Sequence, residues 1–352
     1  MRQVRLIAAC FLLLLGASPQ RAGISDQGSN TPQQAAASDE LTQRRAMMDE
    51  IHQHIDARDF AWLDSKGRSL RTERSRTVSG VWKLELYYNS MWDFGEIGSA
   101  PSCTDPAESA IAEWRRLSPN SPAPFITSAE RLLAKAWCLR GSGYASEVDD
   151  TAWKPFYDHL DAAYDMLARH KAVASVDPNY YAVMASIYVA QGRDEEEFRA
   201  LLDEGTRKEP FYYALYSEAF RYYEPQWGGS YAAEEALARF AVEKTRVKDR
   251  NSAFARIYWV AMDCGCMPPA EAVNQPILRQ AMADLAELYP DPWNVSHMAR
   301  MACAIGDGNL ARHYFDALPR GDGGKSGWAN SNGFDRPRWQ ACRATARLPA
   351  NA

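Results

Sequence analysis

The sequence predicts an all-α fold, a right-handed solenoid of tetratricopeptide-like helical hairpins with an irregular, disulfide-tied C-terminal tail. Three observations predict it. Apolar residues recur at helical spacing through most of the 352 residues. The stretch from Asp177 to Pro210 has the length of one tetratricopeptide hairpin. Similar units follow in series as far as residue 319, and stacked repeats of this kind bury one continuous core.

The first residues predict a cleaved signal peptide over residues 1–22. Arg2 and Arg5 precede an apolar run over residues 6–17, which is too short to span a bilayer permanently. A lipoprotein signal ending at Cys10 is the alternative, but it would cut the apolar run in half. We therefore expect a periplasmic or secreted protein.

Composition narrows the classes of function. The chain is 46% hydrophobic and 11% aromatic, enough for a sizeable core. Its net charge of −5 becomes more negative once the arginines of the signal peptide are removed, which argues against a nucleic-acid partner. No later apolar run is long enough for a membrane span after signal removal. Residues 23–39, rich in Ser, Gln and Ala, predict a flexible leader.

An N-terminal helical region is expected over residues 40–100. Between Leu41 and Leu63 the apolar spacing indicates two amphipathic helices with a break near Arg58. The stretch from Val81 to Trp92 is rich in large apolar residues and fits either a strand or a buried helix. We favour a helix because its surroundings are helical.

The solenoid itself is expected over residues 101–319. Asp105 and Pro106 open its first helix, because proline is favoured at the first helical position. A proline-rich turn separates this helix from one over residues 127–139, and a further helix covers residues 153–170. Four hairpins then follow, at residues 177–210, 213–240, 252–289 and 295–315. About ten to twelve helices result, closed by an irregular cap over residues 320–352.

Three sequence fragments together are similar to one bacterial family. They are Gly-Val-Trp-Lys-Leu at residues 80–84, Ala-Trp-Cys-Leu-Arg-Gly-Ser-Gly-Tyr-Ala at 136–145 and Pro-Gln-Trp-Gly-Gly-Ser at 225–230. Over residues 80–241 the chain resembles the family known as domain of unknown function 4034, which implies a secreted or envelope-linked, tetratricopeptide-like protein. An arginine usually precedes the tryptophan of the third fragment in that family, whereas this chain has Gln226. The family has no assigned activity, so the resemblance implies no catalytic residue.

The third fragment can also be explained by structure alone. Pro225 ends a helix, two glycines permit a tight turn, and Ser230 caps the next helix. Trp227 would then fill a groove between helices. The alternative is that Trp227 stacks on a ligand at the concave face.

Six cysteines follow the predicted signal peptide, an even number that predicts disulfides in an oxidising compartment: Cys103, Cys138, Cys264, Cys266, Cys303 and Cys342. We expect Cys103 to pair with Cys138, because they lie at the meeting ends of two antiparallel helices.

Among the other four cysteines, a bond between Cys264 and Cys266 is not expected because its ring would be small. Each should pair with Cys303 or Cys342, in an order that the sequence leaves open. A four-thiolate zinc site is the alternative, but the spacing lacks the two close pairs of known zinc ribbons. We expect no metal and no cofactor.

A binding or scaffold function is favoured over catalysis. The expected partner is a peptide, protein or glycan of the bacterial envelope, held in a groove that we assign to Tyr181, Tyr188, Tyr213, Tyr216 and Trp227. Many of these aromatic residues must also serve the core, because each hairpin buries one face. The alternative is a secreted hydrolase that acts on an envelope polymer through two carboxylates in the groove.

Overall fold

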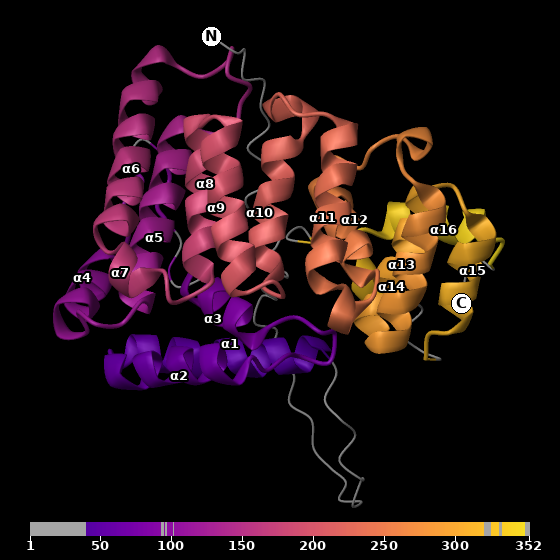
Figure 1. Cartoon of the computed structure of the whole chain (residues 1–352), viewed down its shortest axis with the longest axis horizontal. Coiled ribbons are helices and arrows are strands. Elements are labelled where there is room, and N and C mark those ends of the chain that lie inside the picture. Colours follow the sequence, from indigo (N-terminus) through magenta and orange to yellow (C-terminus); the bar gives the residue numbers. More distant parts are fainter. Residues whose placement is uncertain are drawn as a thin grey trace, which may run out of the picture.

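The computed structural model describes residues 40–348 except 93, 94, 96, 101, 320–324, 331 and 332. The predicted signal peptide and leader, and parts of the predicted cap, lie outside the described residues. Within them the fold is all-α, as predicted, and most of the helices stand side by side in one long row (Figure 1). The predicted right-handed twist of the solenoid stays a prediction.

The helices of the first half include three that the sequence placed correctly. The break near Arg58 separates α1 from α2, and the ambiguous stretch after Val81 is helix α3. The bounds are α1 Glu40–Asp56, α2 Phe60–Glu73, α3 Lys83–Trp92, α4 Glu108–Leu117, α5 Ala123–Arg140, α6 Asp150–Arg169, α7 Lys171–Ala174 and α8 Asn179–Gln191.

The second half continues the row with the predicted hairpins. Short 3₁₀ turns interrupt the row. The described residues contain more helices than the ten to twelve expected, partly because the C-terminal tail adds one. The bounds are α9 Glu195–Lys208, α10 Tyr213–Tyr223, η2 Pro225–Trp227, α11 Tyr231–Asp249, α12 Ser252–Cys264, η3 Ala270–Ala272, α13 Gln275–Leu288, α14 Pro292–Ala304, α15 Gly308–Asp316, η4 Lys325–Trp328, β1 Ala329–Asn330, β2 Gly333–Phe334 and α16 Arg336–Thr345.

Helix α8 lies at the centre of the row and is apolar nearly all round. It contacts α5, α6, α9 and α10, and its residues from 179 to 187 are all buried. A helix that is hydrophobic on every side must be enclosed by others. This explains why α8 resembles the first helix of a repeat in sequence and yet presents almost no open surface.

The N-terminal helices lie across the row instead of joining it. Figure 1 shows α1 and α2 crossing beneath one edge of the other helices. The last residues of α2 and the chain that follows it run along the same edge, and we call residues 71–82 the strap. Arg71, at its start, lies 3.1 Å from Asp177. The Nε of Arg74 lies 3.1 Å from Glu209.

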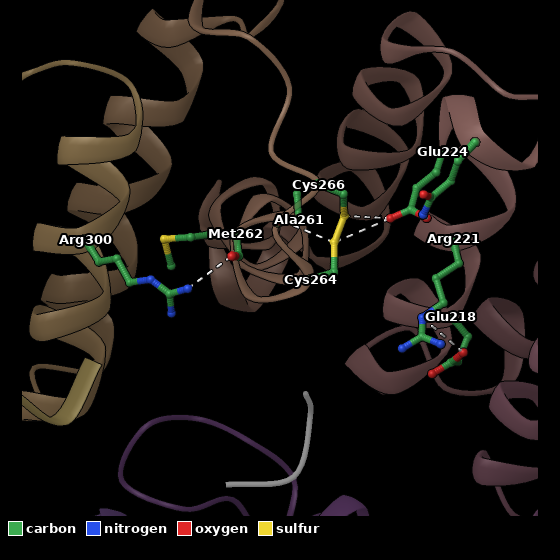
Figure 2. Close-up of a disulfide and its surroundings, with 9 residues drawn as sticks. Glu218, Arg221, Glu224, Ala261, Met262, Cys264, Cys266 and Arg300 are labelled. Atoms are coloured by element: carbon green, nitrogen blue, oxygen red, sulfur yellow. Dashed lines mark hydrogen bonds and ion pairs between the residues drawn. A yellow bond between two sulfur atoms is a disulfide. The ribbon is translucent and has the colours of Figure 1, made fainter. Parts of the chain in front are cut away.

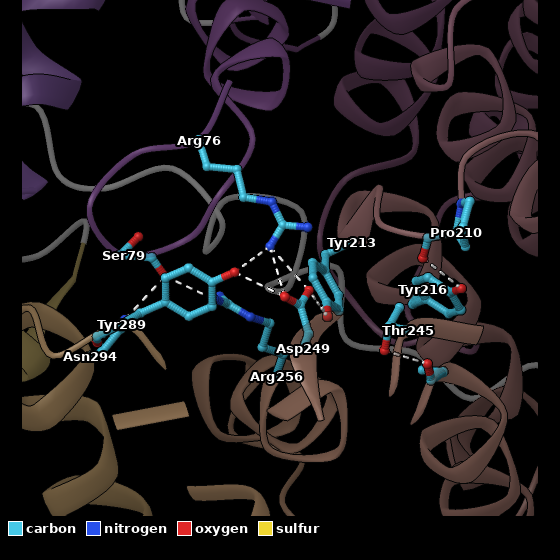
Figure 3. Close-up of polar contacts among 11 residues, drawn as sticks. Arg76, Ser79, Pro210, Tyr213, Tyr216, Thr245, Asp249, Arg256, Tyr289 and Asn294 are labelled. Atoms are coloured by element: carbon cyan, nitrogen blue, oxygen red, sulfur yellow. Dashed lines mark hydrogen bonds and ion pairs between the residues drawn. The ribbon is translucent and has the colours of Figure 1, made fainter. Parts of the chain in front are cut away.

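The strap continues to the third junction between hairpins, where its contacts are buried. Arg76 donates to both carboxylate oxygens of Asp249, at 3.1 and 3.0 Å, and to the hydroxyl of Tyr289 (Figure 3). The carbonyl of Ser79 accepts from Arg256 at 2.8 Å. One arginine thus meets one acid at each of three successive junctions, which fixes the strap along this edge.

The C-terminal tail is more regular than predicted. It was expected to be irregular, but a two-stranded antiparallel pair, β1 and β2, leads into helix α16. Asp335 starts this helix by accepting from the backbone N–H of Arg338, a standard N-terminal cap. Trp328 and Trp339 are buried, and a disulfide ties the tail to the body as expected, although its partner is Cys303 of α14 and not Cys264 or Cys266. The apolar contacts of these tryptophans explain why the polar tail folds against the body.

Candidate functional site

Most of the aromatic residues assigned to a binding groove lie in the core. Tyr181 is 1% exposed, Tyr216 is fully buried and Tyr213 is 8% exposed. These three therefore pack between helices and are not available to line a groove. Tyr188 and Trp227 are partly exposed, so a contact between either of them and a partner stays a prediction.

A different surface gathers aromatic side chains at the edge opposite the strap. Helices α10 and α12 begin at the strap, and their C-terminal ends lie at this other edge together with the end of α5. We call it the distal edge and define it by residues 137–157, 224–234 and 264–266. It contains two of the three fragments that carry the family resemblance.

Arg140 organises the first part of the distal edge. It is the last residue of α5, and its Nη1 donates to the carbonyls of Gly141 and Gly143 at 3.0 and 3.1 Å. Its guanidinium carbon lies 5.4 Å from the ring centroid of Trp137 and 5.1 Å from that of Trp153, within the range of cation–π attraction. Burial lowers the pKa of Arg140. A cation is thereby held between two indoles.

Both indoles are partly exposed, and further aromatic rings extend the cluster outwards. The ring of Tyr157 is stacked beside that of Trp153, and Tyr157 is 44% exposed. Tyr144, on the loop after α5, is 45% exposed. We name Trp137, Arg140, Trp153, Tyr157 and Trp227 the aromatic cluster.

Trp227 joins the aromatic cluster from a segment about ninety residues further along the chain. Its ring meets that of Trp137 edge to face, with centroids 6.3 Å apart. The two fragments that resemble one family are therefore neighbours in space. The contact agrees with the structural interpretation of Trp227 as a residue packed between helices, and its partial exposure leaves the ligand-stacking interpretation open.

The turn around Trp227 depends on its two glycines for different reasons. Gly228 has a φ of +95°, which a residue with a side chain rarely adopts. A Cβ on Gly229 would lie 1.9 Å from the backbone oxygen of Tyr223. Ser230 then caps α11 by accepting from the N–H of Ala233, as predicted. This turn wraps closely around the residue that precedes it, Glu224.

Two glutamates at the distal edge are buried. Glu224 is 2% exposed and its carboxylate accepts from the amide of Gln226 at 2.6 Å. Glu234, in the first turn of α11, is fully buried, and neither of its oxygens has a hydrogen-bond partner. Burial raises the pKa of Glu224. Burial, and then the charge of Glu224, raises the pKa of Glu234 to about 8.

The disulfides confirm one predicted pair and correct the others. Cys103 and Cys138 are bonded, as expected. The prediction that Cys264 and Cys266 would each bond one of the distant cysteines is wrong, because Cys303 bonds Cys342. This pairing also leaves no set of four thiolates for the alternative zinc site.

Cys264 and Cys266 are bonded to each other, which the sequence argument had judged unfavourable. Helix α12 ends at Cys264, and Gly265 adopts a φ of +72° that reverses the chain. The N–H of Cys266 then donates to the carbonyl of Ala261 at 2.9 Å. The two Cα atoms lie 5.3 Å apart, within the usual range for a disulfide. The glycine between the cysteines is what the ring argument overlooked.

This pair faces Glu224 across the distal edge, as Figure 2 shows. One carboxylate oxygen of Glu224 lies 2.7 Å from the sulfur of Cys266 and 3.5 Å from that of Cys264. The carboxylate oxygen and the two sulfurs lie within 4.8 Å of one another, but the sulfurs are bonded to each other and are not free thiolates for a metal ion. As a disulfide beside a carboxyl group, they are instead placed for thiol chemistry.

Neither Arg140 nor Glu224 was singled out from the sequence. Arg140 lies inside one of the fragments that suggested the family, and Glu224 directly precedes another. An arginine at a helix end and an acid before a proline are common and carry no local signal of burial.

A hollow elsewhere on the surface lies away from this edge. It is lined by the loop between α14 and α15 and by the end of α16, with Arg279 and Arg312 among its residues. Arg279 is already paired with Asp307, at 2.9 Å. We assign no function to the hollow.

Comparison with family models, with curated proteins and with solved structures found no match to this chain. None of the described helices is long and apolar enough to cross a membrane.

Proposed function

We propose that the protein is an extracytoplasmic binding or scaffold protein of the bacterial envelope that holds a peptide, protein or glycan at its distal edge. The proposal includes the signal peptide, a periplasmic or secreted location, a tetratricopeptide-like solenoid and membership of the family known as domain of unknown function 4034. Three disulfides among the described residues support an oxidising compartment.

The observation that carries the proposal is the aromatic cluster. Trp137, Trp153 and Trp227 are partly exposed, and Tyr157 is 44% exposed. Tryptophan, tyrosine and arginine are the residues enriched at the centres of protein interfaces. Indole and phenol faces also stack on sugar rings and on peptide side chains at little cost in side-chain entropy.

The carboxylates of this edge favour binding over the hydrolase alternative. Glycoside hydrolysis needs two carboxyl groups that flank a bond of the substrate in an open site. Glu224 and Glu234, the acids with raised pKa at this edge, are both buried. A polymer chain could not lie between them without opening the helices.

The test compares capture of partners by the protein and by a Tyr157→Ala variant. Immobilised protein is incubated with extracts of the bacterial envelope, and bound proteins and glycans are identified by mass spectrometry. Because Tyr157 is exposed, its truncation should leave the melting temperature nearly unchanged and should weaken capture at least about tenfold, the effect of a central interface residue.

The matched control is Val247→Ala, an exposed apolar residue near the strap end of α11. It should capture the same partner as the unmodified protein. Equal capture by the Tyr157→Ala variant, or loss of capture by the Val247→Ala variant alone, would refute the distal edge as the binding surface.

A further inference from the structure

The Cys264–Cys266 disulfide does not act as a staple. The other two bonds join cysteines 35 and 39 residues apart: one ties the chain before α4 to α5, and the other ties α14 to α16. A disulfide stabilises mainly by closing a long loop in the unfolded chain, and this one closes a loop of separation two. Removing it would free almost no additional chain. Its position therefore calls for another explanation.

The access of an incoming thiol to the sulfurs also distinguishes this disulfide from the other two. Cys103 is fully buried and Cys342 is 5% exposed, so each staple has one sulfur that an incoming thiol cannot approach easily. Cys264 and Cys266 are both partly exposed, and the glycine between them is exposed. Thiol–disulfide exchange requires a thiolate to reach a sulfur along the bond axis, so access sets its rate.

The carboxyl group of Glu224 is held in place beside these sulfurs. Its backbone carbonyl accepts from the N–H groups of Trp227 and Gly229, at 2.9 and 3.0 Å, and its side chain accepts from Gln226. The fragment that resembles the family thus forms the holder for this acid. Burial raises the pKa of Glu224, while Arg221, Gln226 and Trp227 lower it and Glu218 raises it. The neighbouring buried Glu234 adds negative charge to the same region when ionised.

We propose that Cys264 and Cys266 form a thiol–disulfide exchange site for a dithiol of a polypeptide, with Glu224 as the group that supplies a proton to the departing sulfur. The site lies on the distal edge but does not depend on the binding function proposed above.

The reaction balances without any further reagent. A thiolate of the polypeptide attacks the Sγ of Cys264, the Cys264–Cys266 bond breaks, and its electron pair goes to the Sγ of Cys266. That sulfur lies 2.7 Å from Glu224 and takes the carboxyl proton. The second thiolate of the polypeptide then attacks the polypeptide's sulfur in the mixed disulfide. This closes the polypeptide disulfide and releases Cys264 as a thiolate. The polypeptide dithiol loses two electrons, and the cysteine pair gains them.

The first experiment uses the unmodified, folded protein. It is mixed with a reduced peptide that contains two cysteines, with a chelator present, and samples are quenched with acid, alkylated and mapped by mass spectrometry. We expect one peptide disulfide to form for each pair of protein cysteines that becomes labelled. Cys264 and Cys266 should be labelled at least about tenfold faster than the other four cysteines. A peptide that stays reduced, or label that spreads equally over all six cysteines, would overturn the proposal.

The second experiment tests Glu224 with a matched control. Glu224→Gln keeps the shape of the side chain but has no proton to transfer, so the exchange should slow by about tenfold or more. Glu243→Gln removes an exposed carboxylate of α11 that does not contact the sulfurs, so its rate should be unchanged. Equal rates for the two variants would overturn the role of Glu224. The first experiment needs no variant, so it decides the exchange reaction even if Glu224→Gln fails to fold.

Discussion

The two edges of the helical row treat buried acids in opposite ways. At the strap edge, Asp249 is fully buried and meets Arg76 as well as the hydroxyls of Tyr213 and Tyr289. At the distal edge, Glu234 is equally buried, and neither oxygen has a hydrogen-bond partner. A buried carboxylate can be stabilised by a cation or can avoid its charge by keeping a proton. Asp249 at the strap edge has the cation Arg76 as its partner, whereas Glu234 at the distal edge has no such partner and a raised pKa.

This difference indicates that the strap edge has a structural role and that the distal edge carries the candidate functional site. Ionic contacts hold the strap on the junctions between hairpins, whereas buried acids with a raised pKa and exposed aromatic rings gather where the helices α5, α10 and α12 end. The same neutralising substitution should therefore have opposite effects at the two edges.

The largest expected effect is at the strap. Asp249→Asn leaves Arg76 buried without its counter-charge, and breaking one half of a buried pair costs about 3–5 kcal/mol of the free energy of unfolding. Urea unfolding at neutral pH measures it. Asp165→Asn, which breaks the exposed pair with Arg169, is the control and should change stability by no more than about 0.5 kcal/mol. Similar losses in both variants would contradict the contrast between buried and exposed pairs.

At the distal edge, Glu234→Gln should stabilise the protein as the pH rises. The pKa of Glu234 is about 8 in the folded protein and near its ordinary value of 4.5 when unfolded, so the folded state binds more protons between these values. The unmodified protein therefore loses stability as the pH rises through this window, by at most about 1.4 kcal/mol per pH unit, and the glutamine variant lacks this loss.

The measurement for Glu234 is the difference in unfolding free energy between variant and unmodified protein at several values from pH 5 to pH 8. Taking the difference removes the contribution of Glu130, whose pKa burial also raises to about 8. Glu243→Gln, at an exposed position of the same helix, should give a difference that does not depend on pH. A flat difference for Glu234→Gln would show that its carboxyl is ionised in the folded state.

The turn that supports Glu224 should be sensitive to one glycine more than to its neighbour. Gly229→Ala places a Cβ against the backbone oxygen of Tyr223, and overpacking of this kind costs about 1–3 kcal/mol. Gly228→Ala meets no atom within 4 Å and should cost about 1 kcal/mol, through its positive φ alone. Thermal unfolding compares the two, and a larger loss for Gly228→Ala would mean that the turn relaxes around residue 229.

The smallest effect is expected where the strap is exposed. The side chain of Arg74 is 59% exposed, so its pair with Glu209 should contribute no more than about 1 kcal/mol. Arg74→Gln should thus lower stability slightly at low salt and hardly at all at high salt, because salt screens exposed charges. A loss as large as that of Asp249→Asn would mean that the strap acts as one cooperative unit.

Local patterns in the sequence were sufficient for much of the fold. The break near Arg58, the helix after Val81 and the cap at Ser230 depend on neighbours a few residues away, and the structure has all three. The pair Cys103–Cys138 was also predictable, because two consecutive antiparallel helices bring their ends together. Helix α16 was missed because the glycines and prolines of the tail concealed its short apolar pattern.

The candidate site could be predicted only in part. Tyr181 and Tyr216 have the spacing of a helix face, but spacing does not distinguish a face in contact with another helix from an open one. The Cys264–Cys266 bond was missed because ring size was considered without the reversal at Gly265.

The sequence by itself determined the all-α class, the hairpins, and two fragments, around Arg140 and Trp227, that stood out. It could do so because helices, caps and turns arise from interactions within a few residues. Only the tertiary structure decided that Trp137 meets Trp227, that Arg76 neutralises Asp249 and that Glu224 faces Cys266. These contacts join residues between 42 and 173 positions apart in the chain. Whether an acidic side chain at such a contact is paired with a cation or keeps its proton depends on which helices enclose it.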